Sequence, residues 1–447
     1  MPQKNRSFFG MQRSFSTLVL VAVILSAGSR ENAKAQGTVD RSAAEATPTN
    51  IPPMLPRPTL TESLDVQQTM VKQQPDDQTE KFRLGIIQFL RALEGLGQDH
   101  HRYGLMSGQR LTVPLMRLPV PENKDPEELS YADARQMIVR FLERLNTAQQ
   151  TLQHIDPADV RLPVDLATVG LDLNADGNLS DGESLLAISS AIQRGGRPPS
   201  QPLPTAFPVT FDGGDVPWLE GYCHVLSAFC EFALAHDWQD HFERSAVLFY
   251  PKAVTPYTWM HDETQDSVMT LNRISILDIV AFLHCINYEC TEPERMKNSL
   301  QHLETMIACS RKSWELIEAE TDNDREWLPN ARQTSIMGSL QITQQIVTGW
   351  KDVLDEFEAI LQGRKLLPFW RGVSGAPSSR PMQFHQKLGV NVRRIFLEPG
   401  RFDLALWMHG SGLQKYVEEG ELTSPDDWRK FNRAFGGRFW NFAFWIN

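Results

Sequence analysis

Residues 172–183 carry a run of oxygen-bearing side chains that restricts the local fold more than any other stretch of the sequence. The run reads D-L-N-A-D-G-N-L-S-D-G-E, with Asp172 at position 1, Asn174 at 3, Asp176 at 5, Gly177 at 6, Asn178 at 7, Ser180 at 9 and Glu183 at 12. The glycine permits the sharp turn that would fold these oxygens around one centre. A hard cation of calcium's size takes about six to eight oxygen ligands, and a bidentate carboxylate at the last position suits calcium better than magnesium. The run therefore predicts a metal-binding loop.

The order and spacing of these donors resemble the EF-hand calcium loop. The resemblance covers the twelve residues and part of their flanks. It implies a Ca²⁺ ion held by the side chains of Asp172, Asn174, Asp176 and Glu183 and by the main-chain carbonyl of Asn178. The alternative is a surface turn without an ion, because Asp, Asn and Gly favour turns for backbone reasons.

The two flanks of the loop differ from each other. Residues 184–193 read as a helix that ends at Gly195 and Gly196. On the other side, apolar residues alternate from Val160 to Leu166 and Pro163 interrupts any helix, which predicts an extended segment. The sequence carries one such loop, whereas calcium sensors usually pair two. We therefore expect a structural calcium site rather than a switch.

Residues 1–35 read as a signal peptide. Lys4, Arg6 and Arg13 precede an apolar core at 17–27 that is too short to span a bilayer, and a small-x-small cleavage pattern ends at Ala35. We expect an exported protein, periplasmic or extracellular, in which a calcium affinity of about 10⁻⁴ to 10⁻³ M would suffice. No later stretch reaches the roughly 18 apolar residues of a transmembrane helix.

The rest of the chain predicts a mainly α, multi-helix protein with a short mixed C-terminal region. We expect a Pro/Thr/Gln-rich linker at 36–74, an N-terminal helical part at 75–194, a Pro/Gly-rich connection at 195–217 and a C-terminal helical domain at 218–447. A formal net charge of −11 and the lack of a Lys/Arg-rich run argue against nucleic acid as a partner.

Apolar periodicity and capping signals place the individual helices. Helices are expected at 82–93 (ending before Gly95), 215–236, 272–288, 300–317 and 336–361. A further helix is expected to begin at a capping box formed by Ser130 and Asp133. The segment 272–288 is apolar nearly all round, which predicts a central, buried helix. After Pro368, short apolar runs indicate strands or brief helices, and the aromatic tail 439–446 should pack on the core or a partner.

A second group of residues offers a different function. Glu220 and His224 lie four residues apart, on one helix face, and His236, Asp240 and His241 follow near the end of that helix. Inward-facing carboxylates and imidazoles build transition-metal sites in helix bundles, so the alternative function is a periplasmic enzyme centred on these residues. The spacings of known zinc and di-iron motifs are absent. A polar helix face or a hydrogen-bonded core histidine is the simpler interpretation, and the sequence favours a binding protein over an enzyme.

The cysteines do not form a disulfide framework. The chain has five, at 223, 230, 285, 290 and 309. Cys223 and Cys230 lie about 10 Å apart along one helix and cannot bridge each other. A link from either to Cys285 or Cys290 and a set of buried free thiols both remain open.

Overall fold

The computed structural model describes most of the chain. The described residues are 54–55, 59–106, 116, 118–193, 202–261, 270–271, 274–334, 336, 342–371, 387–424 and 428. The expected signal peptide 1–35, the two glycines at 195–196 and the tail 439–446 lie outside them. Within the described residues the chain is mainly helical with small sheets, which confirms the expected fold class at this level.

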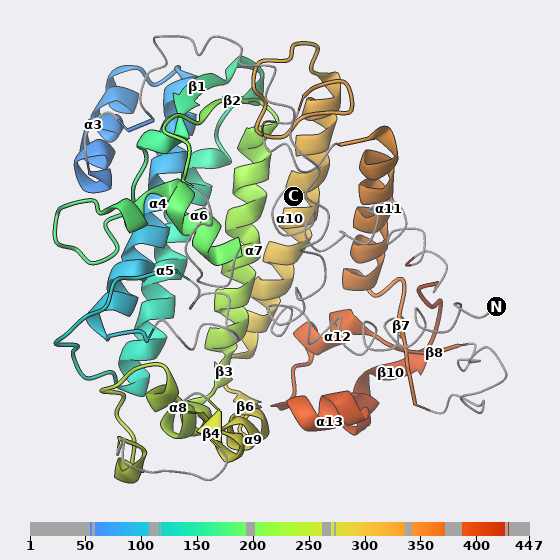
Figure 1. The fold of residues 1–447 in the computed structure, drawn as a ribbon. Coiled ribbons are helices and arrows are strands. Elements are labelled where there is room, and N and C mark those ends of the chain that lie inside the picture. Colours follow the sequence, from blue (N-terminus) through green and yellow to red (C-terminus); the bar gives the residue numbers. More distant parts are fainter. Residues whose placement is uncertain are drawn as a thin grey trace, which may run out of the picture.

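Four long helices lie side by side and form the body of the molecule (Figure 1). They are α4 (Gln78–Arg102), α5 (Tyr131–Leu152), α7 (Asp215–Ala235) and α10 (Pro293–Ala319). Helix α5 packs against α4 on one side and α7 on the other, and α7 packs most extensively against α10. Helix α7 is therefore the central element, and its two long neighbours bury both of its sides.

Local signals in the sequence explain where these helices begin. The Asp77 side chain accepts a hydrogen bond from the Glu80 N–H at 2.9 Å and caps α4. At the start of α5 the Asp133 N–H donates to Ser130 Oγ at 3.1 Å, and the Ser130 N–H donates to Asp133 Oδ2 at 3.2 Å. The predicted capping box is confirmed.

Helix α4 continues past the position where the sequence predicts its end. It runs through Gly95 and Gly97 to Arg102. A Cβ at Gly95 would lie 2.5 Å from an Arg144 guanidinium nitrogen of α5, and a Cβ at Gly97 would lie 2.4 Å from Leu173 Cδ2. The prediction of an end before Gly95 is wrong, because these glycines allow close packing against neighbouring segments instead of ending the helix.

Two groups of buried apolar residues form the core, one on each side of α7. The first lies among α4, α5, α7 and the segments 160–166 and 209–211, and the second lies among α10, α11 (Gln344–Leu361) and the C-terminal elements. Trp218 and Trp327 pack against both groups. Their rings meet edge to face with centroids 5.8 Å apart, so these two side chains join the two halves of the core.

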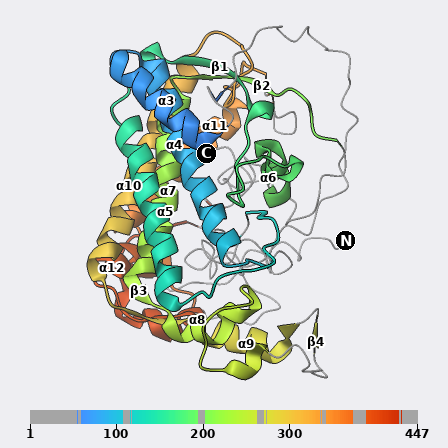
Figure 2. The ribbon, with the colours of Figure 1, turned by 90° about the vertical axis from the view of Figure 1, so that its left-hand side faces the viewer.

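A two-stranded antiparallel sheet, called the hairpin below, covers one end of the four helices. Strand β1 (Arg161–Asp165) pairs antiparallel with β2 (Pro208–Asp212), with Leu162 opposite Phe211. The buried side chains of β1 alternate, which confirms the extended segment predicted from the alternating apolar residues. The residues between the two strands include the loop 172–183 and α6 (Leu185–Gln193), which confirms the helix expected after the loop. Figure 2 shows α6 beside α4 rather than among the four long helices.

The expected linker ends earlier than predicted. Helix α3 (Leu60–Gln73) occupies its second half, begins at a Thr59 cap and packs on α4. Leu60 and Leu64 lie on one face, and Leu60 is buried in the first core group. The Pro-rich composition before residue 59 concealed this short amphipathic pattern.

Two further helix predictions need correction. The segment 272–288 contains a short helix, α9 (Ile276–His284), at the periphery, with Leu277 66% and Val280 57% exposed. It is not central, because α7 and α10 already occupy the centre of the bundle and α9 packs on the small helices α8 (Gln239–Ser245) and α13 (Leu404–His409). The helix predicted at 336–361 begins at Gln344, where Thr343 supplies the cap.

The C-terminal region is mixed, as predicted. One three-stranded sheet has the order β10 (Val417–Glu419), β8 (Leu388–Val390), β7 (Leu367–Pro368), and another has the order β3 (His236–Asp237), β6 (Asn287–Cys290), β9 (Phe402–Asp403). Short helices α12 (Val392–Leu397) and α13 accompany them, and strands β4 (Thr270–Leu271) and β5 (Ile274–Ser275) pair beside α9. Among the described helices, none combines the length and apolar character needed to cross a membrane.

Candidate functional site

The loop 172–183 lies on the surface between β1 and α6, and its backbone follows the turn that the sequence predicts. Gly177 has φ +79°, a conformation that glycine adopts without steric cost. Ala175 has φ +59°, which is rare for a residue with a Cβ. These two left-handed residues, separated by Asp176, turn the chain tightly within the first half of the loop.

The side chains of this first half bind to the loop's own backbone. The Asp176 N–H donates to Asp172 Oδ1 at 3.2 Å, and the Gly177 N–H donates to Asp172 Oδ2 at 3.0 Å. Asn174 Oδ1 lies 3.1 Å from the Asp176 nitrogen, and the Asn178 N–H donates to Asp176 Oδ1 at 2.7 Å. The hydrogen bond from Asn178 lowers the pKa of Asp176, so this carboxylate is charged at neutral pH.

Glu183, at the last position, is held beneath the loop. It is 1% exposed. Its Oε1 accepts the Leu173 N–H at 2.8 Å, and its Oε2 accepts the Ser180 N–H at 2.9 Å and the Ser180 hydroxyl at 2.7 Å. A buried carboxylate with both oxygens directed at the loop is suited to the closing role, although binding an ion would require Glu183 to exchange its Ser180 bonds for the metal.

The loop carboxylates are not gathered around one point in this arrangement. Among the described residues, the group of three carboxylates with oxygens within 4.8 Å of one another lies elsewhere, and Asp172, Asp176 and Glu183 do not form such a group. The predicted ligands thus share one loop, but their carboxylate oxygens do not all lie within 4.8 Å of one another.

Two residues of α4 hold the start of the loop, and sequence reasoning missed both. Glu94 Oε1 accepts the Asp172 N–H at 2.9 Å, and the Gln98 amide donates to the Asp172 carbonyl at 2.8 Å. Burial raises the pKa of Glu94, and the Arg91 guanidinium, 2.5 Å away, opposes that rise. No spacing rule could identify these residues, because they come from a helix far from the loop in sequence.

The loop is also closed at its base by main-chain hydrogen bonds. The Leu171 N–H donates to the Glu183 carbonyl at 2.9 Å, and the Leu185 N–H donates to the Val169 carbonyl at 2.8 Å. These bonds flank an antiparallel bridge between Gly170 and Ser184. The first and last ligand positions are therefore adjacent, as a loop that encloses an ion requires.

The residues of the alternative site fall into two separate groups. Glu220 and His224 lie together on α7, with His224 Nε2 3.9 Å from Glu220 Oε1. His302 of α10, which the sequence analysis did not single out, places its Nδ1 2.7 Å from His224 Nδ1. At this distance only one of the two nitrogens carries the proton. Burial and then His224 lower the pKa of His302 to about 4.

His236 follows the last residue of α7, about 18 Å along the helix axis from His224, and Asp240 and His241 lie on α8. His236 Nδ1 contacts the Phe232 carbonyl oxygen at 2.7 Å, and His241 contacts the Tyr288 hydroxyl. Asp240 forms an exposed ion pair with Arg244 at 2.8 Å. The five residues therefore do not meet in one site in this arrangement.

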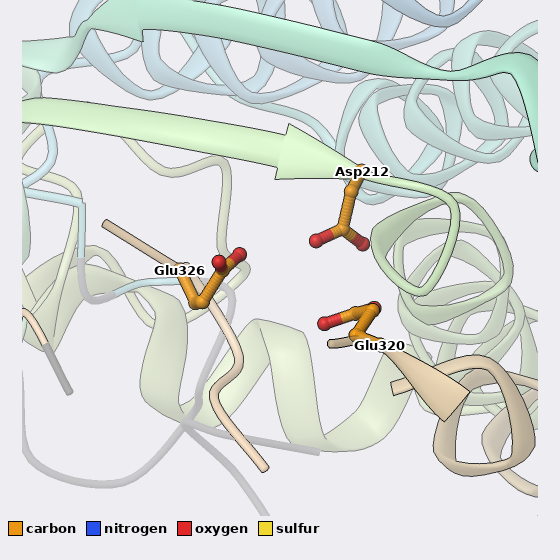
Figure 3. A group of neighbouring side chains, drawn as sticks. All are labelled: Asp212, Glu320 and Glu326. Carbon is orange, nitrogen blue, oxygen red and sulfur yellow. The ribbon is translucent and has the colours of Figure 1, made fainter. Parts of the chain in front are cut away.

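A cluster of carboxylates that the sequence analysis did not identify lies where the hairpin meets α7 and α10 (Figure 3). Asp212 ends β2, Glu320 follows the last residue of α10, and Glu326 lies in the segment after α10. Oxygens of all three lie within 4.8 Å of one another. Figure 3 shows the three carboxylates directed toward a common space. Glu320 and Glu326 are close in sequence but Asp212 is far from both, and the bridge between Thr210 of β2 and Glu326 brings it to them.

Mutual repulsion and burial make the charged forms of this cluster costly. Burial and then Asp212 raise the pKa of Glu320 to about 9 and that of Glu326 to about 7. Asp215, in the first turn of α7, is 2% exposed, and burial followed by repulsion from Asp212 raises its pKa well above the usual range. Asp215, Glu320 and Glu326 therefore favour their protonated forms more than free carboxyl groups do.

A groove of about 840 Å³ runs beside the second half of the loop. Its lining is small and mostly apolar, with Asp181 as its one titratable side chain, and includes Val169, Leu179, Ala187 and Leu203. A groove with a single exposed carboxylate has no acid–base pair for catalysis.

Comparison of the chain with family models, with curated proteins and with solved structures gave no match. The function must therefore be argued from the sites themselves.

Proposed function

We propose that this chain is an exported protein that binds one calcium ion in the loop 172–183, where the ion has a structural role. The observation that carries the proposal is the order of oxygen donors from Asp172 to Glu183 around a left-handed Gly177. The buried Glu183 supplies the closing carboxylate, and the bridge at the base of the loop keeps the first and last donors adjacent.

The ion would neutralise the carboxylates of Asp172, Asp176 and Glu183 and join the β-hairpin to α6. Main-chain bonds already hold the base of the loop, so binding would change its conformation only locally. Such binding stabilises the folded state by mass action, because the unfolded chain has no assembled site. A single loop with a strand on one side has no paired second loop to open, which supports a structural rather than a signalling role.

Calcium-dependent melting of the full-length protein tests this proposal. Calcium should raise the melting temperature relative to chelator, and Glu183→Gln, which removes the closing charge, should make that rise smaller. Asp181→Asn is the matched control, since Asp181 is an exposed carboxylate of the same loop outside the ligand positions. A rise of equal size in Glu183→Gln and the parent, or no rise in the parent, contradicts the proposal.

The alternative function, an enzyme of the periplasm or cell exterior, is favoured by one observation, the contact between His224 and His302 beside Glu220. Paired imidazoles next to a carboxylate are ligands that Zn²⁺ and other transition metals accept. Analysis of copurifying metals distinguishes the two functions. Zinc, iron or manganese that is lost on His224→Ala without loss of folding would favour the enzyme.

A further inference from the structure

We propose that Asp212, Glu320 and Glu326, with Asp215 beside them, form a second calcium site, separate from the loop 172–183. The site lies where β2 ends, α7 begins and α10 ends. It would join the hairpin to the two most extensively packed helices of the molecule.

The distances within the cluster suit an ion of this size. Oxygens of Asp212, Glu320 and Glu326 lie within 4.8 Å of one another. Calcium binds oxygen at about 2.3–2.6 Å, so ligands around one ion lie within roughly 5 Å of each other. Magnesium is usually bound by about one or two carboxylates and keeps several waters, which makes a site with three carboxylates a better match for calcium.

A further observation comes from Asp215, which is 2% exposed and is hydrogen-bonded to Asp212. Its Oδ2 accepts the Asp212 N–H at 2.9 Å, but its Oδ1 is buried without a hydrogen-bond partner. The carboxylates of Asp212, Glu320 and Glu326 are close enough to Asp215 to repel its charge. An unpaired buried carboxylate oxygen is costly, and a cation in the cluster would offset that cost.

Two more buried oxygens at the same place lack partners. Glu320 Oε1 has none, and neither has the hydroxyl of Thr210, which is 2% exposed. Thr210 lies two residues before Asp212 on β2 and bridges to Glu326, so its side chain shares the face of Asp212. Gly214 lines the cluster from the other side, where a Cβ would lie 3.2 Å from Glu320 Oε1 and 3.4 Å from Asp212 Oδ1.

No protein cation balances these charges among the described residues. Arg161 pairs at the rim with Asp322 at 3.0 Å and with Asp324 at 2.7 Å, and Arg325 next to Glu326 forms no ion pair with the cluster, although its Nη1 is buried without a hydrogen-bond partner. Arg325 also pairs with Asp324, at 3.1 Å.

Asp212 shares a hydrogen bond with Glu320 and with Glu326, and the main-chain and amide donors that reach the four carboxylates are neutral. They are the Gly214 N–H to Asp212, the Asp212 N–H to Asp215, the Gln333 amide to Glu320 and the Asp324 N–H to Glu326. A divalent cation supplies the positive charge that the surrounding residues do not.

Calcium titration in the Glu183→Gln background tests this site separately from the loop. The full-length Glu183→Gln protein should still bind about one Ca²⁺ by calorimetry. Adding Glu320→Gln and Glu326→Gln should abolish this binding. Adding Glu315→Gln instead, an exposed carboxylate of α10, should leave it unchanged. Gln retains the shape of Glu, and circular dichroism in chelator reports whether each variant is folded.

Several outcomes would overturn the proposal. Equal calcium binding with and without Glu320 and Glu326 would show that the ion lies elsewhere. If a folded Glu183→Gln protein binds no Ca²⁺, the carboxylates of the cluster are neutralised by shared protons and not by an ion. Preferential binding of Mg²⁺ or Mn²⁺ in competition would overturn the choice of ion. Terbium luminescence provides a second measurement, because Trp327 adjoins Glu326 in sequence and should sensitise a lanthanide bound there, whereas Trp327→Phe should reduce the signal without reducing affinity.

Discussion

The buried carboxylate of Glu94 accepts a hydrogen bond from the main-chain N–H of Asp172 at 2.9 Å. This contact links α4 to the first ligand position of the proposed calcium loop. The side-chain amide of Gln98 adds a second contact, because it donates a hydrogen bond to the main-chain carbonyl of Asp172. The loop is therefore positioned by a helix as well as by its own hydrogen bonds.

Replacing Glu94 should weaken both the fold and calcium binding. Glu94→Ala leaves the Asp172 N–H without its acceptor and removes the partner of Arg91, which should lower the free energy of unfolding by about 1.5–3 kcal/mol. Calcium affinity should fall as well, because the first ligand is no longer held. Glu94→Gln keeps an acceptor and should recover much of the affinity. Calorimetry and urea unfolding measure the two effects, and an unchanged calcium affinity in Glu94→Ala would show that α4 does not position the loop.

The left-handed turn at Gly177 provides a test of loop geometry alone. A Cβ there would touch nothing within 4 Å, so Gly177→Ala changes only the backbone preference. Holding alanine at φ +79° should cost about 1–2 kcal/mol. This cost should reduce the calcium affinity roughly tenfold or lower the free energy of unfolding. Gly182→Ala is the control, since its Cβ is also unobstructed and its φ is not positive. Equal effects of the two substitutions would argue against a strained turn.

The cysteines should behave as free thiols of two kinds. All five are unpaired, which answers the question that the sequence left open, and Cys223, Cys230 and Cys309 are buried. Burial raises the pKa of Cys230 and of Cys309 to about 12, which suppresses the reactive thiolate. A thiol reagent should therefore modify Cys285 and Cys290 in the folded protein and the other three only after unfolding. Mass spectrometry of the native protein would contradict this if it found a disulfide or rapid labelling of Cys230.

Acid should destabilise the protein through His241. Burial lowers the pKa of His241 to about 4, whereas an unfolded histidine titrates near about 6.5. Between these values the unfolded state binds the extra proton, so stability is fully present above about pH 6.5 and declines as the pH falls toward about 4. The slope should approach about 1.4 kcal/mol per pH unit for this one proton.

A matched pair of substitutions isolates this contribution. His241→Gln should make the decline in the free energy of unfolding between those pH values less steep, and the remaining decline includes the contribution of His302, whose pKa is also lowered to about 4. His154→Gln should leave the decline unchanged, because His154 is exposed. Urea unfolding at several pH values measures the slopes, and identical slopes in the parent and His241→Gln would show that another group carries the acid sensitivity.

Local signals in the sequence determined much of the secondary structure. The capping box at Ser130 and Asp133, the alternating residues of β1 and the run from Asp172 to Glu183 depend on neighbours within a few positions. Capping, strand alternation and turn conformation are short-range effects, so a sequence pattern can specify them. The order of donors in the proposed calcium loop belongs to the same class.

Tertiary packing decided the features that join distant segments. Gly95 and Gly97 look like a helix end in sequence, but they allow α5 and Leu173 to approach α4 closely. The apolar helix α9 was expected at the centre, yet the long helices α7 and α10 occupy that place and leave α9 at the periphery.

The contacts that matter most for the two proposed sites are also tertiary. Glu94 reaches Asp172 from another helix, and Asp212 meets Glu320 and Glu326 only because β2 ends beside the end of α10. Carboxylates repel one another and carry no periodic signature, so their convergence follows from how the helices and the hairpin pack, which residue spacing along the chain does not encode.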